Sequence, residues 1–250
     1  MSAAELCQEH IAFQANLYES KNPTRRWLHN ARRDWVLRAL DQVAPSPAVF
    51  LEVGIGCGIY TEVMAKRGHV VAIDINPTFV DAANCLPNVT AKVADITATD
   101  LGPIHDVALC SEVLEHVIDS RSSLKNLYAS LKPGGFLVLS TPNSYSTVEL
   151  VARLLTFKPV VELARLIYGE SVDDLGHINR MTRTQLRRQI DDAGFEVIQQ
   201  ENVAFYIPVI AEFGGATGAK LCQWFAKKLA PTRFAALLWT QCWVLRRPPA

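Results

Sequence analysis

The chain has 250 residues, of which 49% are apolar and 20% are charged. This length holds one α/β domain with a full core or two small domains, and the apolar share excludes a disordered chain. With 25 basic and 25 acidic residues the net charge is zero, so no global field draws the chain to nucleic acid. The charge is nevertheless sorted along the chain. The first 45 residues carry +1, residues 205–250 carry +5, and the residues between them carry −6.

The predicted elements begin with a helical segment up to about Val43, after which strand and helix signals alternate. Helices are expected over Tyr60–Arg67, after Asn76-Pro77, and from the cap Asp119-Ser120 to Leu131. Strands alternating with helices predict a doubly wound, mostly parallel α/β sheet. The first five strands are expected at Val49–Val53, His69–Asp74, Val89–Ala94, His105–Cys110 and Phe136–Ser140.

The later elements are less regular. An apolar, helical insertion is expected over Thr147–Tyr168, and a helix over Thr182–Ala193 that ends at Gly194. The late strands are expected at Phe195–Phe205 and Leu237–Arg246, with a second helical insertion over Glu212–Leu229 between them. The sequence thus predicts an N-terminal helical cap over residues 1–45 and one domain over residues 46–250. The domain carries insertions at about 144–180 and 206–235.

Cysteine usage and the apolar runs bear on the compartment. The six cysteines form no CxxC pair and show no zinc-ligand spacing, which is typical of reduced thiols in the cytoplasm. The first ten residues lack the basic and apolar regions of a secretory signal. The uncharged stretch near the end is far shorter than the ~20 residues of a membrane helix. We expect a cytoplasmic protein that contacts a membrane at most at its surface.

A glycine-rich turn follows the first strand. Gly54, Gly56 and Gly58 stand between a predicted strand and a predicted helix, and Glu52 precedes them. Glycines are needed where a ligand must touch backbone, because a Cβ would collide with it. Asp74 lies 20 positions after Gly54 at the end of the second strand, where a carboxylate can bind ribose hydroxyls. The alternative is a tight turn with an acid that caps the next helix.

A family resemblance rests on these residues and on three further motifs. LEVGIGCG, Asp74, VADI, DVALCSEVLEH and LKPGGFLVLSTPN resemble, in order and spacing, the class I S-adenosylmethionine-dependent methyltransferases. The resemblance covers residue 49 to about residue 195 and implies a Rossmann-like, seven-stranded sheet with an antiparallel last strand. It implies that S-adenosylmethionine contacts the glycine turn with its methionine part, the second strand's end with its ribose, and the third strand's end with its adenine. The implied cofactor-binding residues are Glu52, Gly54, Gly56, Gly58, Asp74, Ile75, Asp95, Ile96 and Ser111, with Cys110 to Glu112 beneath the methyl group.

An ExxEH motif follows the fourth strand. On a helical turn Glu112, Glu115 and His116 would share one face, and two carboxylates with an imidazole suit a divalent cation such as Mg²⁺ or Zn²⁺. The motif resembles that of ubiquinone-pathway O-methyltransferases and of small-RNA 2′-O-methyltransferases. This resemblance implies that His177 completes a metal site with those three residues. Two alternatives stay open: His116 acts as a general base without metal, beside Glu112, or the motif makes only local structural contacts.

The flanking segments suggest how the site is enclosed. In related enzymes a leading helix closes over the cofactor carboxylate, which makes Tyr18, Arg26 and Arg33 candidates; a solvated basic face is the alternative. The apolar insertion after the fifth strand predicts a lid over an apolar acceptor, or else an extra core helix or dimer contact. In the second insertion, Trp224 and Phe225 beside lysines predict a membrane-surface helix or a solvated helix packed on the sheet.

The resulting hypothesis is an enzyme, an S-adenosylmethionine-dependent methyltransferase that O-methylates a small, apolar acceptor such as a phenol or quinone precursor. An RNA 2′-O-methyltransferase is the first alternative, but it needs a basic channel, which the zero net charge and the −6 central region disfavour. An N- or C-methyltransferase of a natural product or lipid, and a cofactor-binding scaffold without activity, are further alternatives. The glycine spacing disfavours a nicotinamide oxidoreductase.

Overall fold

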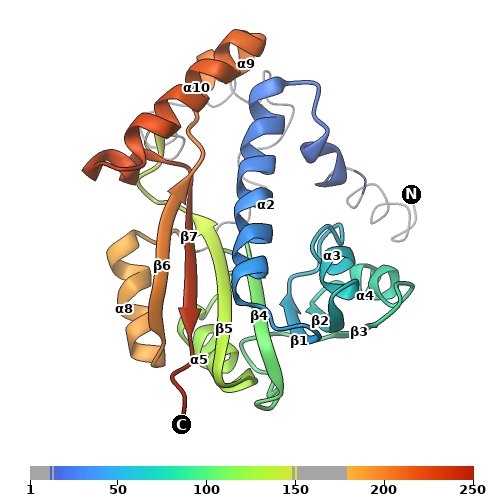
Figure 1. The fold of residues 1–250 in the computed structure, drawn as a ribbon. Helices are drawn as coiled ribbons and strands as arrows, with labels where there is room; N and C mark the ends of the chain where they lie inside the picture. Colours follow the sequence, from blue (N-terminus) through green and yellow to red (C-terminus); the bar gives the residue numbers. More distant parts are fainter. Residues whose placement is uncertain (1–11, 13, 148–149, 151–178) are drawn as a thin grey trace.

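A single mixed sheet of seven strands forms the centre of the described molecule (Figure 1). The computed structural model describes residue 12, residues 14–147, residue 150 and residues 179–250. The strand order is β3-β2-β1-β4-β5-β7-β6. Strand β7 runs in the opposite direction to the other six, so it pairs antiparallel with both β5 and β6, and the remaining pairs are parallel. This confirms the expected doubly wound sheet with an antiparallel last strand. The strands are β1 (Ala48–Val53), β2 (Gly68–Asp74), β3 (Val89–Val93), β4 (His105–Ser111), β5 (Leu131–Pro142), β6 (Glu196–Val203) and β7 (Thr240–Arg246).

The strand order places a switch point beside β1. The chain moves outward from β1 through β2 to β3 and then returns to the other side of β1 with β4. In open α/β sheets, ligands bind outside the carboxyl ends of the strands at such a point. The ends that matter here are Val53 of β1, Asp74 of β2 and Ser111 of β4.

Helices cover both faces of the sheet (Figure 1). Most begin where the sequence offers a cap: the side chains of Asn22, Asn76 and Asp119 accept backbone N–H bonds, and Thr182 forms a capping box with Gln185. The helices are α2 (Pro23–Val43), α3 (Thr61–Ala65), α4 (Pro77–Ala83), α5 (Ser120–Ser130), α8 (Arg183–Ala193), α9 (Pro208–Phe213), α10 (Gly215–Leu229) and the 3-10 helix η2 (Arg233–Leu237). Residues 14–18 are also helical.

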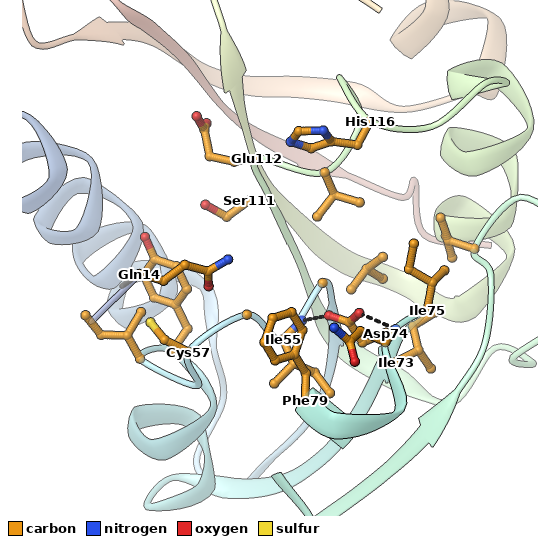
Figure 2. A pocket seen from close by; sticks show the side chains of 18 of the residues that line it. Gln14, Ile55, Cys57, Ile73, Asp74, Ile75, Phe79, Ser111, Glu112 and His116 are labelled. Atoms are coloured by element: carbon orange, nitrogen blue, oxygen red, sulfur yellow. Dashed lines mark hydrogen bonds between the residues drawn. The ribbon is translucent and has the colours of Figure 1, made fainter. Parts of the chain in front are cut away.

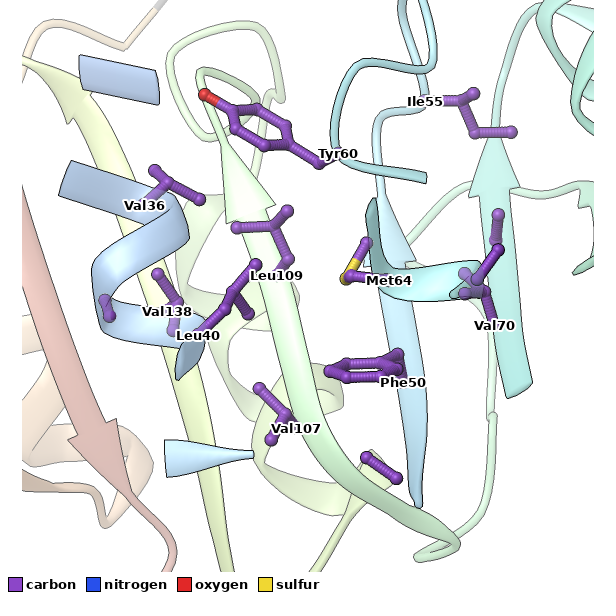
Figure 3. Close-up of a cluster of buried hydrophobic side chains, with 14 of the residues drawn as sticks. Val36, Leu40, Phe50, Ile55, Tyr60, Met64, Val70, Val107, Leu109 and Val138 are labelled. Atoms are coloured by element: carbon purple, nitrogen blue, oxygen red, sulfur yellow. The ribbon is translucent and has the colours of Figure 1, made fainter. Parts of the chain in front are cut away.

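Two apolar cores lie on opposite faces of the sheet. On one face Val36 and Leu40 of α2 and Met64 of α3 pack with Phe50 and Val107 from the strands (Figure 3). On the other face α5 and α8 supply the buried leucine and isoleucine side chains. Full burial of one such side chain stabilises the fold by about 1.5–3 kcal/mol. Helix α2 is therefore part of the core, while the expected domain division at residue 45 stays a prediction.

Several boundaries differ from those expected. The first crossover helix spans only Thr61–Ala65, and the strand expected over Phe195–Phe205 ends at Val203. The helix expected over Glu212–Leu229 is divided into α9 and α10 at Gly214, where a Cβ would lie 2.4 Å from the carbonyl oxygen of Ile210. Most of the insertion expected at 144–180 lies outside the described residues. Within the described ranges, no helix is long and apolar enough to cross a bilayer.

Candidate functional site

A cavity of about 500 Å³ opens at the carboxyl ends of β1, β2 and β4. The glycine turn forms one wall, with φ of 80° at Gly54 and 55° at Gly56. A Cβ on Gly54 would lie 2.4 Å from Cγ2 of Val113, and one on Gly56 would lie 2.7 Å from Oε1 of Gln14. The positive φ favours glycine at both positions, and at Gly54 the space does so as well, whereas at Gly56 the close atom is the end of the flexible Gln14 side chain. Gly58 has a φ of 75° but does not line the cavity.

Asp74 lies at the end of β2 with its carboxylate fixed by backbone (Figure 2). Oδ2 accepts a hydrogen bond from the N–H of Ile55, and Oδ1 accepts one from the N–H of Asn76, both at 2.8 Å. Asp74 lines the cavity together with Gly54 and Gly56 of the glycine turn. This is the placement that the sequence predicted for a ribose-binding acid.

Next to Asp74 the cavity has an apolar wall. Ile75, Phe79 and Ile96 line it from the end of β2, from α4 and from the segment after β3. Asp95 also lines it and accepts a 2.8 Å hydrogen bond from the N–H of Thr97. The sequence indicated Ile75, Asp95 and Ile96; Phe79 was missed, although an aromatic residue in the first turn after Asn76-Pro77 is the signal that points to it.

Glu52 lies beneath the glycine turn and does not line the cavity. Its side chain is buried, and its Oε2 accepts a 2.6 Å hydrogen bond from the hydroxyl of Thr61. Oε1 is buried without a hydrogen-bond partner among the described residues. Burial raises the pKa of Glu52 to about 8, and the nearby charge of Asp74 adds to the shift. Glu52 therefore supports the turn from below, where the resemblance had implied a contact with the cofactor.

A buried ion pair closes the opposite wall. Nη1 of Arg32 in α2 lies 2.8 Å from Oε2 of Glu112, which directly follows β4. Oε1 of Glu112 accepts a 2.9 Å hydrogen bond from the hydroxyl of Ser140, and that hydroxyl is 2.9 Å from the hydroxyl of Ser111. Burial alone would lower the pKa of Arg32, but the Glu112 carboxylate raises it above its ordinary value. The guanidinium also stacks over the ring of Trp239, 5.6 Å from its centroid.

Of the tandem arginines in α2, Arg32 rather than Arg33 lines the cavity. Arg33 pairs with Asp34 at 3.0 Å and stacks over the ring of Tyr18, which does line the cavity. The candidate Arg26 does not line it either. Sequence reasoning missed Arg32, but a signal was present. Arg32 falls on the buried stripe of α2 formed by Leu28, Trp35, Val36, Ala39 and Leu40.

His29, one turn before Arg32, is a second cavity residue that the sequence did not single out. Its ring lies between the rings of Tyr18 and Trp239, at centroid distances of 5.8 and 5.4 Å. Burial, and then the charges of Arg32 and Arg25, lower its pKa to about 3. The imidazole is therefore neutral near pH 7.

The ExxEH motif is not helical, and the expectation that its three residues share a helix face is wrong. Glu112 has a φ of 56°, and the following residues form a turn closed by a 2.9 Å bond from the N–H of His116 to the carbonyl of Val113. Glu112 and His116 line the cavity (Figure 2). Glu115 is instead buried, and its Oε2 accepts a 3.0 Å hydrogen bond from the hydroxyl of Thr141. Burial, together with the charge of Glu112, raises the pKa of Glu115 well above its usual range.

This arrangement does not fit a cation held by the motif. Both oxygens of Glu112 already have partners, and Glu115 lies away from the cavity. Across the described ranges, no three histidine, cysteine or acidic side chains form a group that could hold a metal ion. The expected fourth ligand, His177, lies outside the described residues.

The chain matches a known protein family over most of its length. A family model described as a methyltransferase domain matches residues 24–200. Ubiquinone biosynthesis O-methyltransferase of Xanthomonas axonopodis pv. citri is 34% identical over 145 residues, which cover 51% of this chain and 59% of that protein. The mitochondrial ubiquinone biosynthesis O-methyltransferase of Schizosaccharomyces pombe is 34% identical over 126 residues, covering 47% of this chain and 44% of that protein. The chain thus spans about half the length of these relatives.

Solved structures share the fold at low identity. An N-methyltransferase of Bradyrhizobium japonicum bound to S-adenosyl-L-homocysteine superposes with a TM-score of 0.57 at 16% identity, covering 98% of both chains. A [4+2]-cyclase superposes with a TM-score of 0.58 at 18% identity, covering 87% of this chain and 81% of that one. The fold therefore does not fix the chemistry by itself. The match to the family model is stronger evidence, because the matched residues 24–200 contain the glycine turn, Asp74 and β4. This chain is therefore a member of the class I S-adenosylmethionine-dependent methyltransferases.

Proposed function

We propose that the chain transfers a methyl group from S-adenosylmethionine to a hydroxyl of a small, apolar acceptor such as a phenolic quinone precursor. The observation that carries this proposal is the cavity at the switch point, which joins a glycine turn, a fixed carboxylate and an apolar wall. The two relatives named as O-methyltransferases support oxygen as the acceptor atom. The cofactor supplies an activated methyl group on a sulfonium, so the chain has to orient, desolvate and deprotonate.

The residues present fit this cofactor. The Asp74 carboxylate is positioned to accept hydrogen bonds from ribose hydroxyls, and Ile75, Phe79 and Ile96 offer an apolar slot for an adenine ring. On the other side, Arg32 lines the cavity, and a guanidinium is suited to bind a carboxylate. The absence of a Cβ at Gly54 and Gly56 leaves room for close contact with backbone.

Three of the titratable side chains that line the cavity, His29, Glu112 and His116, are candidates for the general base. His29 is a weak base because its pKa falls to about 3. Both carboxylate oxygens of Glu112 are already engaged, one by the guanidinium of Arg32 and one by the hydroxyl of Ser140. His116 lines the cavity beside Glu112 on a turn, and we assign it the removal of the acceptor proton.

The acceptor and the compartment are inferred from chemistry. The apolar composition of the insertion expected at 144–180 supports a lid over an apolar acceptor. The five described cysteines are free thiols, which supports the cytoplasm as the site of action, although one relative is named as mitochondrial.

Binding of S-adenosylhomocysteine by titration calorimetry tests the cofactor site. Asp74→Ala should weaken binding at least tenfold, since a hydrogen bond to a charged group contributes about 1.5–3 kcal/mol. Asp81→Ala is the matched control, because Asp81 is an exposed acid on α4 outside the cavity. Equal affinities of the two variants would contradict the placement of the cofactor.

Methyl-labelled cofactor then tests the acceptor. The proposal predicts label in a catechol that carries an isoprenoid tail, and less label in catechol itself. Label in an RNA duplex end or in an amine, with none in either catechol, would refute O-methylation of a small acceptor while leaving the cofactor site intact.

A further inference from the structure

Helix α10 carries exposed apolar and basic side chains on its outer face. Its buried side is formed by Gly218, Ala219 and Cys222. The opposite side presents residues spaced three, four and seven apart, so they share one face of the helix. This set, called here the α10 face, consists of Lys220, Leu221, Trp224, Lys227 and Lys228, all exposed.

The apolar members of this region are unusually exposed. Trp224 is 53% exposed and Leu221 is 38% exposed. Phe213, at the end of α9, is 71% exposed, and Phe234 in η2 is 48% exposed. The ring of Trp224 makes a T-shaped contact with the ring of Phe225, with the two centroids 5.0 Å apart. Four large apolar side chains on three consecutive elements are more than isolated surface residues, and they indicate an interaction surface.

The charge of this region has a single sign. Helix α10 and η2 carry four basic residues, Lys220, Lys227, Lys228 and Arg233, and residues 213–237 contain no acid. The acid just before them, Glu212, is mostly buried and accepts hydrogen bonds from Arg25 and from the hydroxyl of Tyr206. The guanidinium of Arg233 lies 5.0 Å from the centroid of the Phe234 ring, so a cation again accompanies an exposed aromatic side chain. Exposed apolar side chains together with four cations on α10 and η2 complement an anionic lipid surface, in which aromatic and aliphatic groups enter the headgroup layer.

The position of α10 relates this surface to the cavity. The register pairs Pro142 of β5 and Val203 of β6 with Thr240 of β7, so the carboxyl ends of β5 and β6 lie at one edge of the sheet. Helices α9 and α10 follow β6, and η2 precedes β7, so all three lie at this edge (Figure 1). The cavity opens at the same edge, beyond Ser111 of β4, which pairs with Ser140 of β5.

We propose that the α10 face, with Phe213 and Phe234, binds the surface of an anionic lipid bilayer. The protein then lies on the membrane with the edge of the sheet at which the cavity opens, the carboxyl ends of β4, β5 and β6, toward the lipid. An acceptor with an apolar tail would reach the cavity from the bilayer rather than from water; this last step rests on the proposed function, whereas membrane binding does not.

Flotation with vesicles of phosphatidylcholine, with and without 30% phosphatidylglycerol, tests the proposal on the whole chain. The expected result is binding to the anionic vesicles that weakens as salt rises, because surface charges are screened. Absence of binding to both vesicles would overturn the proposal, and so would equal binding to both at all salt concentrations. Turnover of a soluble catechol, measured in parallel, separates failure of this surface from failure of the proposed function.

Matched variants locate the contact. Lys227→Glu with Lys228→Glu should weaken binding to anionic vesicles at least 25-fold, since each basic residue near such a surface contributes about a factor of five. The control, Lys66→Glu with Lys125→Glu, changes net charge equally at exposed positions on other elements and should leave most of the binding intact. Equal losses in both double variants would reduce the effect to net charge and overturn the assigned surface.

A further pair of variants tests the apolar contribution. Trp224→Ala should weaken vesicle binding about tenfold, the amount expected from the apolar area of one large side chain. Ile104→Ala is the control, because Ile104 is 53% exposed just before β4, at the opposite edge of the sheet. Sedimentation of both variants completes the test. If Trp224→Ala leaves vesicle binding unchanged but converts a dimer into a monomer, the surface contacts a second copy of this chain and the proposal is wrong.

Discussion

Replacement of Arg32 by Met should destabilise the protein and weaken cofactor binding together. The change removes one partner of a buried ion pair whose other member, Glu112, has a side chain that is 18% exposed. Removing one partner from a fully buried pair costs about 3–5 kcal/mol. Because Glu112 keeps its hydrogen bond from Ser140 and some exposure, we expect a lower cost of about 2–4 kcal/mol. At about 2–4 °C per kcal/mol for a chain of this size, the midpoint of thermal unfolding should fall by roughly 4–16 °C.

The assay is a double-mutant cycle in urea, with Arg32→Met, Glu112→Gln and the two combined. Direct coupling predicts that the combined variant is about 1.5–3 kcal/mol more stable than the sum of the single effects implies. Arg33→Met is the matched control, because Arg33 pairs with Asp34 at the surface and should cost about 0.5 kcal/mol or less. Additive effects of Arg32→Met and Glu112→Gln, or equal costs at positions 32 and 33, would refute the reasoning.

Three further predictions concern the turn, the buried acid and the ExxEH segment. Gly54→Ala should abolish binding of S-adenosylhomocysteine, because it forces a Cβ into Val113, whereas the control Gly102→Ala, at a φ of 64° with open space around it, should cost only about 1–2 kcal/mol of stability. Equal effects of the two variants in urea unfolding and in calorimetry would contradict the steric role of Gly54. The pKa of Glu52 is about 8 in the folded chain and about 4.5 in the unfolded chain, so the carboxyl loses its proton at lower pH when the chain is unfolded, and the wild-type free energy of unfolding should fall as pH rises from 4.5 to 8. Glu52→Gln should lessen that fall, and parallel stability curves of the two proteins between pH 5 and 8 would exclude the shift. His116→Gln should lower kcat about 10²–10⁴-fold with cofactor affinity unchanged. Turnover by the wild-type protein should persist in EDTA, because Glu112 is engaged by Arg32 and Ser140, and loss of turnover in EDTA with recovery in Mg²⁺ would show that the ExxEH motif rearranges to bind metal.

The sequence predicted those parts of the fold and site that depend on local pattern. The alternation of strands and helices can be predicted from the sequence because most strands are short apolar runs and several helices begin at an Asn, Asp or Thr cap. Asp74 lies at the end of β2, as predicted, because the end of a parallel strand fixes where its side chain lies. Its contact with ribose stays a prediction. The glycine turn likewise follows from spacing, and the structure gives Gly54 and Gly56 the positive φ that such a turn requires.

The rest depends on contacts between distant segments. Helical periodicity was assumed to continue through Glu112, but its left-handed φ redirects the chain and leaves Glu115 bonded to Thr141 of β5. The choice between Arg32 and Arg33 is settled by which side of α2 faces Glu112, a residue 80 positions away. His29 could not be recognised from sequence because its lowered pKa arises from burial and from Arg32 and Arg25 in the folded chain.

The two backbone bonds to Asp74 affect which ligands the cavity distinguishes. Because Ile55 and Asn76 already hold both carboxylate oxygens at 2.8 Å, the side chain has little rotational freedom within the folded chain. The entropy of ordering it, about 0.5–1.5 kcal/mol for a flexible side chain, is lost during folding and not at each binding event. The acceptor lone pairs therefore stand at fixed positions, and a deoxy nucleoside that leaves one of them unsatisfied cannot regain the lost contact by a shift of the carboxylate. If the cofactor binds as proposed, discrimination between ribose and deoxyribose follows from the backbone that holds Asp74 at the end of β2.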